Sequence, residues 1–244
     1  MSGHSKWATI KRKKGANDAQ RGKIFTKIGR ELAVAVKAGG PDPDTNAKLK
    51  DAIAKAKSNN MPNDTIMRSI KKAAGDTNAD NYEEIIYEGY GPKGIAVIVE
   101  ALTDNRNRTA ADMRHYFDKF GGNLGTSGCV MFMFDQKGVI VIENTGDIDE
   151  EKLMMDALDA GADDVDMGTE CFEITTSPAD FSAVRDAIEK LGYDIIEAEI
   201  QYIGQTEVTL TDEKDILMME KLIEHLEDCD DVQYVWHNWE NPTE

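Results

Sequence analysis

The stretch that decides the fold is residues 83–122, EEIIYEGYGPKGIAVIVEALTDNRNRTAADMRHYFDKFGG. Residues 83–90 have the pattern of a strand, 91–94 (Gly-Pro-Lys-Gly) are typical of a turn, and 95–102 form the apolar run of a buried strand. A helix follows and ends at Gly121-Gly122, with four large apolar residues on one face: Met113, Tyr116, Phe117 and Phe120. The stretch supplies only half of a layered fold, so it requires a partner later in the chain.

The alternation of strands and helices continues to the end of the chain. Further strands are expected at 129–134, 139–143, 170–175, 194–202, 206–210 and 232–237. Further helices are expected at 150–160, 179–191 and 213–227. We interpret these elements as two ferredoxin-like α/β domains, each an antiparallel sheet with two helices on one side. Residues 79–135 and 205–244 form one domain in this interpretation, and residues 136–204 are inserted into it.

Residues 1–78 are interpreted as a separate region, a basic arm followed by a helical domain. Apolar residues recur every four positions (Ile24, Ile28, Leu32, Val36) in a helix that starts near residue 17 and ends at Gly39-Gly40-Pro41. Shorter helices are expected at about 45–58 and from Pro62 to Gly75, and residues 1–16 read as a mobile basic arm. The predicted fold is therefore α+β: a three-helix N-terminal domain, then two ferredoxin-like α/β domains, the third inserted into the second.

Charge is divided by position. Residues 1–75 hold 17 Lys and Arg against 6 Asp and Glu, whereas residues 76–244 hold 11 against 40. A basic end on an acidic body presents one local positive surface to phosphate, although the formal net charge of the whole chain is −18 at pH 7. The alternative is that the two surfaces attract each other within the chain.

Composition excludes several classes of protein. No apolar run approaches the roughly 20 residues of a spanning helix, the N-terminus lacks the apolar region of a secretory signal, and three distant cysteines fit a reducing compartment. We therefore expect a cytoplasmic protein without a membrane partner. No metal-ligand spacing or nucleophile motif is present, and Asp228, Asp230 and Asp231 around Cys229 are interpreted as a solvated helix end. An enzyme, a metal site and a cofactor are not expected.

The basic arm and the first helix supply the candidate nucleic-acid contacts. Dense cations on an extended segment follow a phosphate backbone and release counterions. Trp7 either stacks on a base or anchors the arm to the helical domain. A solvated tail or a patch for anionic lipid are the alternatives for the whole segment. The candidate cations are Lys6, Lys11, Arg12, Lys13, Lys14, Arg21, Lys23, Lys27 and Arg30.

Two further motifs are candidates for phosphate binding. Arg106 and Arg108 precede Thr109, the expected N-cap of a helix, where cations and free N–H groups would combine. The alternative is that both arginines pair with acids of the body. Residues 121–128, GGNLGTSG, lack the signature of a P-loop and are interpreted as a helix C-cap and a tight connection.

Several long motifs together resemble the YebC family, the probable transcriptional regulatory proteins. They are GHSKWATIKRKKGANDAQRGKIFTKIGREL at 3–32, SNNMPNDTI at 58–66, residues 85–109, GGNLGTSG and LEDCDDVQYVWHN at 226–238. The resemblance implies the same three-domain arrangement. It also implies a DNA-binding regulator or, as in related mitochondrial translational activators, a ribosome-associated factor that contacts large-subunit ribosomal RNA. On this chain that contact would fall on His4, Lys6, Trp7, Lys11, Arg12, Lys13, Lys14, Arg21 and Lys23.

Three hypotheses follow, and the first is preferred. It is a non-enzymatic nucleic-acid-binding regulator of gene expression, with DNA favoured by the family name and RNA by the residues, since no helix shows an evident base-reading face. The second is an adaptor whose α/β domains bind a protein or a small ligand. The third is an enzyme. The sequence does not indicate the oligomeric state.

Overall fold

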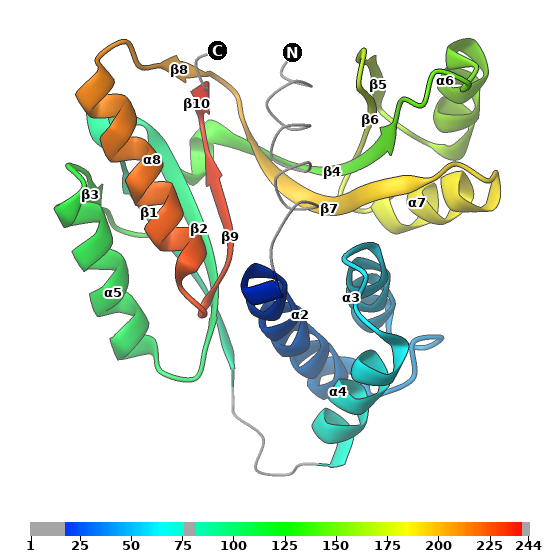
Figure 1. Cartoon of the computed structure of the whole chain (residues 1–244), viewed down its shortest axis with the longest axis horizontal. Helices are drawn as coiled ribbons and strands as arrows, with labels where there is room; N and C mark the ends of the chain where they lie inside the picture. The colour runs from blue at the N-terminus through cyan, green and yellow to red at the C-terminus, as the bar shows by residue number, and fades with distance from the viewer. Residues whose placement is uncertain (1–17, 76–81, 241–244) are drawn as a thin grey trace.

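The computed structural model describes residues 18–75 and 82–240, which form three units (Figure 1). The predicted arm at 1–16 and the polar linker at 76–81 lie outside the described residues. The first unit packs three helices around an aliphatic core, in which Ile28, Leu32 and Val36 are almost fully buried, as their spacing predicts. Its helices are α2 (Asp18–Gly39), α3 (Ala47–Ser58) and α4 (Asn63–Gly75).

The second unit is a four-stranded antiparallel sheet in the order β3-β1-β2-β9. Alternate residues of the strand β2 (Ala96–Thr103), such as Val97 and Val99, pack with Phe117 and Leu222 of the two helices that cover one face of the sheet. The turn between the first two strands contains the short 3-10 helix η1 (Pro92–Gly94). The other elements are β1 (Glu83–Tyr90), β2 (Ala96–Thr103), α5 (Arg106–Lys119), β3 (Asn123–Leu124), α8 (Glu213–Asp228) and β9 (Val232–His237).

The third unit lies between β3 and α8 in the sequence and forms its own antiparallel sheet, in the order β5-β6-β4-β7. This is the strand order of a β-α-β-β-α-β ferredoxin-like sandwich. Phe172 and Ile174 of the sheet pack against Leu153 and Val184 of the two helices. Its elements are β4 (Phe134–Glu143), α6 (Glu150–Ala160), β5 (Asp164–Met167), β6 (Cys171–Thr176), α7 (Phe181–Lys190) and β7 (Ile195–Gly204).

The fold class is confirmed: a helical unit precedes two α/β units, and the strands of one are inserted between those of the other. Both sheets carry two helices on one face, although the second unit has a β1-β2 hairpin at its centre. The residue limits predicted for the domains stay a prediction.

The prediction of strands at 129–134 and 139–143 is wrong in detail. Residues 131–133 form the 3-10 turn η2 (Met131–Met133), and β4 runs without a break from Phe134 to Glu143. The strand expected at 206–210 is reduced to β8 (Val208–Thr209), which pairs in parallel with β10 (Trp239–Glu240). The sequence pattern also missed β5, because its residues DVDM are half acidic.

Candidate nucleic-acid interface

The cationic face of α2 is turned toward the acidic connection between α8 and β9. Lys23, Lys27 and Arg30 lie four and three residues apart, so they share one face of the helix. Lys23 Nζ lies 2.9 Å from Asp228 Oδ1, and Arg30 Nη1 lies 2.8 Å from Asp231 Oδ1. The residues predicted to bind nucleic acid on this helix therefore make ion pairs and hydrogen bonds within the chain.

Backbone carbonyls near the end of α8 accept further hydrogen bonds from this face. Lys27 Nζ donates to the carbonyl of Glu227 at 2.7 Å, and Arg30 Nη1 donates to the carbonyl of Asp230 at 2.6 Å. The last carbonyls of a helix lack partners inside it and lie at the negative end of its dipole, so cations stabilise them. Burial lowers the pKa of Lys27, whereas the hydrogen bond to the Asp228 carboxylate raises the pKa of Lys23.

Asp231 is the centre of the contact, and its side chain is only 7% exposed. Its Oδ2 accepts hydrogen bonds from Arg108 Nη2 at 2.9 Å and from Thr109 Oγ1 at 2.8 Å, while Oδ1 accepts from Arg30. Burial alone would raise the pKa of Asp231, but the hydrogen bonds from Arg108, Thr109 and Arg30 outweigh it and lower the pKa. The hydrogen bonds to Asp231 and then to Asp104 raise the pKa of Arg108. The carboxylate therefore stays ionised while it joins α2 to α5.

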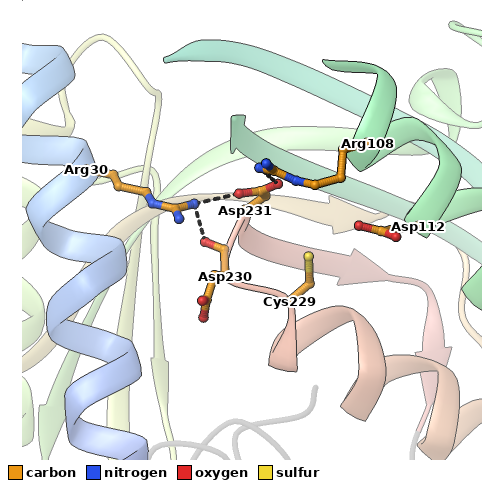
Figure 2. A pocket seen from close by; sticks show the side chains of 6 residues that line it. All are labelled: Arg30, Arg108, Asp112, Cys229, Asp230 and Asp231. Atoms are coloured by element: carbon orange, nitrogen blue, oxygen red, sulfur yellow. Dashed lines mark hydrogen bonds and ion pairs between the residues drawn. The ribbon is translucent and has the colours of Figure 1, made fainter. Parts of the chain in front are cut away.

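A pocket of about 220 Å³ opens beside this cluster, and Figure 2 shows the side chains around it. Two arginines and three aspartates line it, so its formal charge is negative, and both arginines already donate to one of the aspartates. Burial raises the pKa of the pocket's cysteine thiol, which keeps it protonated near neutral pH. This combination is poorly suited to phosphate. The lining residues are Arg30, Arg108, Asp112, Cys229, Asp230 and Asp231.

The start of α5 differs from the prediction. Asn105 is the N-cap, because its side-chain oxygen accepts a hydrogen bond from the backbone N–H of Arg108. Arg106 and Arg108 therefore lie in the first turn of the helix instead of ahead of it, and Thr109 is fully buried. Arg108 pairs with Asp104 and Asp231, which is the alternative that the acidic body suggested.

The interpretation of residues 228–231 as a solvated helix end is wrong for Asp231. Asp228 does lie on the surface, with 65% of its side chain exposed. Asp231, three residues later, begins the return of the chain into the sheet, and its carbonyl accepts a hydrogen bond from the backbone N–H of Leu102 at 2.7 Å. This pairing buries the carboxylate beside the donors from α2 and α5.

A second cluster joins the helical unit to the inserted unit. The Arg185 side chain of α7 is 5% exposed; its Nη1 donates to Asp51 Oδ1 at 2.6 Å and its Nη2 to Asp186 Oδ1 at 2.9 Å. Lys50 of α3 also pairs with Asp186, and Ser182 donates to Asp51. Burial alone would lower the pKa of Arg185, but the hydrogen bonds to Asp186 and Asp51 outweigh it and raise the pKa.

A third contact places Lys55 of α3 against β9. Its Nζ lies 2.6 Å from Glu31 Oε1 and 4.2 Å from the centroid of the Tyr234 ring, and it also hydrogen-bonds the phenol oxygen. Tyr234 in turn stacks on Trp236, with 5.2 Å between ring centroids. Attraction within the chain, the alternative interpretation of the charge division, therefore accounts for part of the positive surface. The cations involved are Lys23, Lys27, Arg30, Lys48, Lys50 and Lys55.

Four other cations of the helical unit lie on its surface without an ion pair among the described residues. Three of them are on α4, at positions between the buried Ile66, Ile70 and Ala73, so they project away from the core. They are not among the contact residues predicted from the sequence, although the helical spacing of those three apolar residues is the signal that finds them. These exposed cations are Lys57, Arg68, Lys71 and Lys72.

The other predicted contact residues are not brought together by the described part of the chain. Arg21 is exposed at the start of α2, and Arg106 is exposed at the start of α5. The arm residues lie outside the described residues, and their role stays a prediction; they are His4, Lys6, Trp7, Lys11, Arg12, Lys13 and Lys14.

The glycine-rich connection after α5 is structural, as expected. Gly121 has a φ of +78° directly after the C-cap Phe120, the left-handed conformation that glycine adopts readily. The backbone N–H groups that follow are turned toward a buried side chain, Glu88, whose carboxylate accepts from Val130 at 2.9 Å and from Met131 at 2.8 Å. Burial alone would raise the pKa of Glu88, but hydrogen bonds from Gly128, Val130 and Met131 lower it.

Neither a metal site nor a membrane span is found in residues 18–75 and 82–240. These residues contain no cluster of three or more His, Cys, Asp and Glu side chains placed to hold a metal ion. They also contain no helix with the length and apolar character needed to cross a membrane.

Fold and contacts together define a class of α+β protein in which a basic helical unit is held by ion pairs against two acidic α/β units. The chain belongs to the TACO1/YebC family. A model of the TACO1/YebC protein N-terminal domain matches residues 5–76, and a model of the TACO1/YebC second and third domain matches residues 82–239. The resemblance drawn from the sequence motifs is confirmed.

Relatives match over nearly the whole chain. A probable transcriptional regulatory protein of Acetivibrio thermocellus is 66% identical over 98% of this chain and 99% of its own length. Another, from Ruminiclostridium cellulolyticum, is 65% identical over 100% of this chain and 98% of its own. The crystal structure of a conserved hypothetical protein, Aq1575 from Aquifex aeolicus, superimposes with a TM-score of 0.83 at 47% identity, covering 93% of each chain.

Proposed function

We propose that this protein is a non-enzymatic regulator of gene expression that binds nucleic acid through its basic N-terminal region. The observation that carries the proposal is the excess positive charge that remains after the ion pairs within the chain are counted. Lys57, Arg68, Lys71 and Lys72 stay exposed, and the segment at 1–16 adds five more lysines and arginines. Such an excess beside an acidic body favours local contact with phosphate and repels nucleic acid elsewhere.

DNA is one candidate target, supported by relatives that are named probable transcriptional regulatory proteins. Reading a promoter in the major groove requires a helix with exposed side chains that recognise base edges, most often arginine, asparagine and glutamine. A DNA-binding version of the proposal would place α4 or the basic arm against the duplex.

Ribosomal RNA is the second candidate, as expected for a ribosome-associated translation factor, and one observation favours it. The cationic face of α2 is covered by the α8–β9 connection, while α4 presents Met67, Arg68, Lys71 and Lys72 with a single arginine among them. Charge with few base-reading groups fits recognition of backbone and shape, which is how proteins bind structured RNA.

The test is crosslinking in living cells, followed by sequencing of the nucleic acid that copurifies. Enrichment of one locus of large-subunit ribosomal RNA would establish the translation factor. Enrichment of discrete promoter fragments would establish the DNA-binding regulator. Recovery of neither above an uncrosslinked control would refute the proposal.

A binding experiment then tests the basic region directly. Replacing Lys11, Arg12, Lys13 and Lys14 by Ala should weaken binding to the recovered nucleic acid and reduce the slope of log affinity against log salt. The reduction should be about 0.9 for each phosphate of duplex DNA, or about 0.7 for each phosphate of a single strand, that the variant no longer neutralises. A control variant removes four exposed lysines from the acidic units and should bind as the unmodified protein does; its sites are Lys119, Lys190, Lys214 and Lys221. Equal affinity and equal slope for the two variants would contradict the assignment.

A further inference from the structure

The outer face of α6 carries three exposed apolar side chains where a surface helix is usually polar. Leu153 and Ala157 point inward and are fully buried, so the opposite side of the helix faces solvent. That side carries Met154, Met155 and Leu158, whose exposures are 41%, 61% and 49%. Met154 and Leu158 are one turn apart, and Met155 and Leu158 are three residues apart, so the three side chains form a continuous stripe.

Acidic residues surround this stripe. Residues 147–166 hold nine Asp and Glu against a single lysine, Lys152, and that lysine is paired with Asp156. Glu151 and Asp159 are exposed on α6 itself, next to the apolar side chains. In Figure 1, α6 lies at the outer edge of the inserted unit, and it packs on α7 and β5 on its inner side.

We propose that this stripe, Met154, Met155 and Leu158 with its acidic rim, is a docking surface for a cationic amphipathic helix of a partner protein. Apolar anchors one turn apart match the i, i+3 and i+4 side chains of a bound helix. Methionine adapts its shape to an irregular partner and is common on surfaces that bind helices. The surrounding carboxylates select a basic partner and exclude an acidic one, because like charges brought together oppose binding.

The probe is a synthetic helical peptide with leucines on one face and lysines on the other, titrated into the full chain. Binding should shift the backbone amide resonances of α6 and weaken as salt is raised. The triple variant Met154→Gln, Met155→Gln and Leu158→Gln should raise the Kd at least about tenfold, because it removes the apolar anchors and keeps the charge. Circular dichroism should show that the variant keeps its fold, since all three side chains are exposed.

Two further variants and a second peptide separate the contribution of the apolar stripe from that of the acidic rim. Met67→Gln removes another exposed methionine, 65% exposed on the basic helix α4, and should leave the Kd unchanged. Glu151→Gln with Asp159→Asn keeps the stripe and should both weaken binding and reduce its salt dependence. A peptide with glutamates in place of the lysines should not bind.

Several results would overturn the proposal. One is equal affinity of the lysine peptide for the triple variant and the unmodified chain; another is equal affinity for the glutamate peptide. Sedimentation that shows self-association abolished by the triple variant would assign the stripe to a second copy of the chain. A rise in peptide affinity on replacing Lys11, Arg12, Lys13 and Lys14 by Ala would assign it to the chain's own basic segment.

Discussion

Asp231 shows how one carboxylate holds two units together. It is buried, and it accepts from Arg30 of the helical unit and from Arg108 and Thr109 of α5. Asp231→Asn removes the charge and replaces one of the two acceptor oxygens by an NH₂ donor, so one of the two guanidinium groups loses its acceptor. Because Arg108 is half exposed and keeps Asp104, we expect a loss of about 2 kcal/mol in the free energy of unfolding, less than the roughly 3–5 kcal/mol lost when a fully buried pair is broken.

Urea unfolding of the variant measures that loss, and Asp228→Asn is the matched control. The control breaks the pair between Lys23 and Asp228, whose side chains are 46% and 65% exposed, so its midpoint should not change measurably. If the two variants unfold at the same urea concentration, the buried carboxylate is not what joins α2 to α5.

His237 makes stability depend on pH. Burial of the imidazole at the end of β9 lowers the pKa of His237 to about 4, below the value of about 6.5 in an unfolded chain. The unfolded state therefore binds the proton first as pH falls. This contribution to stability is fully present above about pH 6.5 and is lost as pH falls toward the folded pKa; between about pH 7 and about pH 5 it amounts to ~2 kcal/mol.

The measurement compares urea unfolding of the unmodified chain and of His237→Gln across that range. The carboxylates titrate equally in both proteins, so the difference between the two curves isolates the histidine. His115→Gln removes an exposed imidazole and should follow the unmodified chain. Parallel curves for His237→Gln and the unmodified chain would show that the partly buried ring does not set the pH dependence.

At the residue scale, the sequence predicts burial well where it follows from spacing and poorly where it follows from distant contacts. Leu32 and Ile70 are buried because their four-residue periods place them on the inner faces of helices. Asp228 and Asp231 look alike in the sequence. Asp231 is buried because its backbone pairs with Leu102 at the turn into the sheet and because side chains of α2 and α5 close over its carboxylate.

At the element scale, the connection after β3 depends on Glu88. Its carboxylate accepts from the backbone N–H groups of Gly128, Val130 and Met131, which would otherwise lack acceptors in a partly buried loop. Glu88→Gln replaces one oxygen by an NH₂ group, which is a donor that faces donors. We expect a cost of about 2 kcal/mol and faster hydrogen exchange at those three amides.

The control is Glu83→Gln, an exposed position on the same strand, which should leave both the stability and the exchange rates unchanged. Unchanged exchange at the three amides in Glu88→Gln would mean that other groups hold the connection.

The sequence predicts the elements that depend on a local pattern and misses those that depend on distant residues. The apolar period of 3.6 predicts α6 and α8 to within a residue or two, because such a period is local information. The apolar run at 129–134 predicts a strand because its composition is that of a strand. Its backbone amides instead donate hydrogen bonds to Glu88, a residue about forty positions earlier in the chain. No local sequence pattern reveals such a contact.

At the scale of the whole molecule, the charge division places ion pairs between the helical unit and both α/β units. The helical unit contributes cations to Asp228 and Asp231 of one α/β unit and to Asp186 of the other. The sequence shows the charge division itself but leaves two alternatives for the basic surface. It can contact phosphate, or it can be attracted to the acidic surface within the chain. Which alternative holds depends on the acidic residues that the fold places next to α2 and α3. Their positions follow from the insertion of one α/β unit into the other.

The orientation of the inserted unit should therefore depend on Arg185. This side chain is buried between α3 and α7 and neutralises Asp51 and Asp186, so Arg185→Met leaves both carboxylates without their shared cation, and Lys50 pairs with Asp186 alone. Each unit keeps its own apolar core, so circular dichroism should change little. Repulsion between the carboxylates should separate the units and increase the radius of gyration measured by small-angle X-ray scattering, more so at low salt. Lys48→Met, which breaks an exposed pair with Glu84, is the control and should scatter as the unmodified chain does. An unchanged radius of gyration in Arg185→Met at low salt would mean that packing of α3 on β7, and not charge, sets the arrangement of the units.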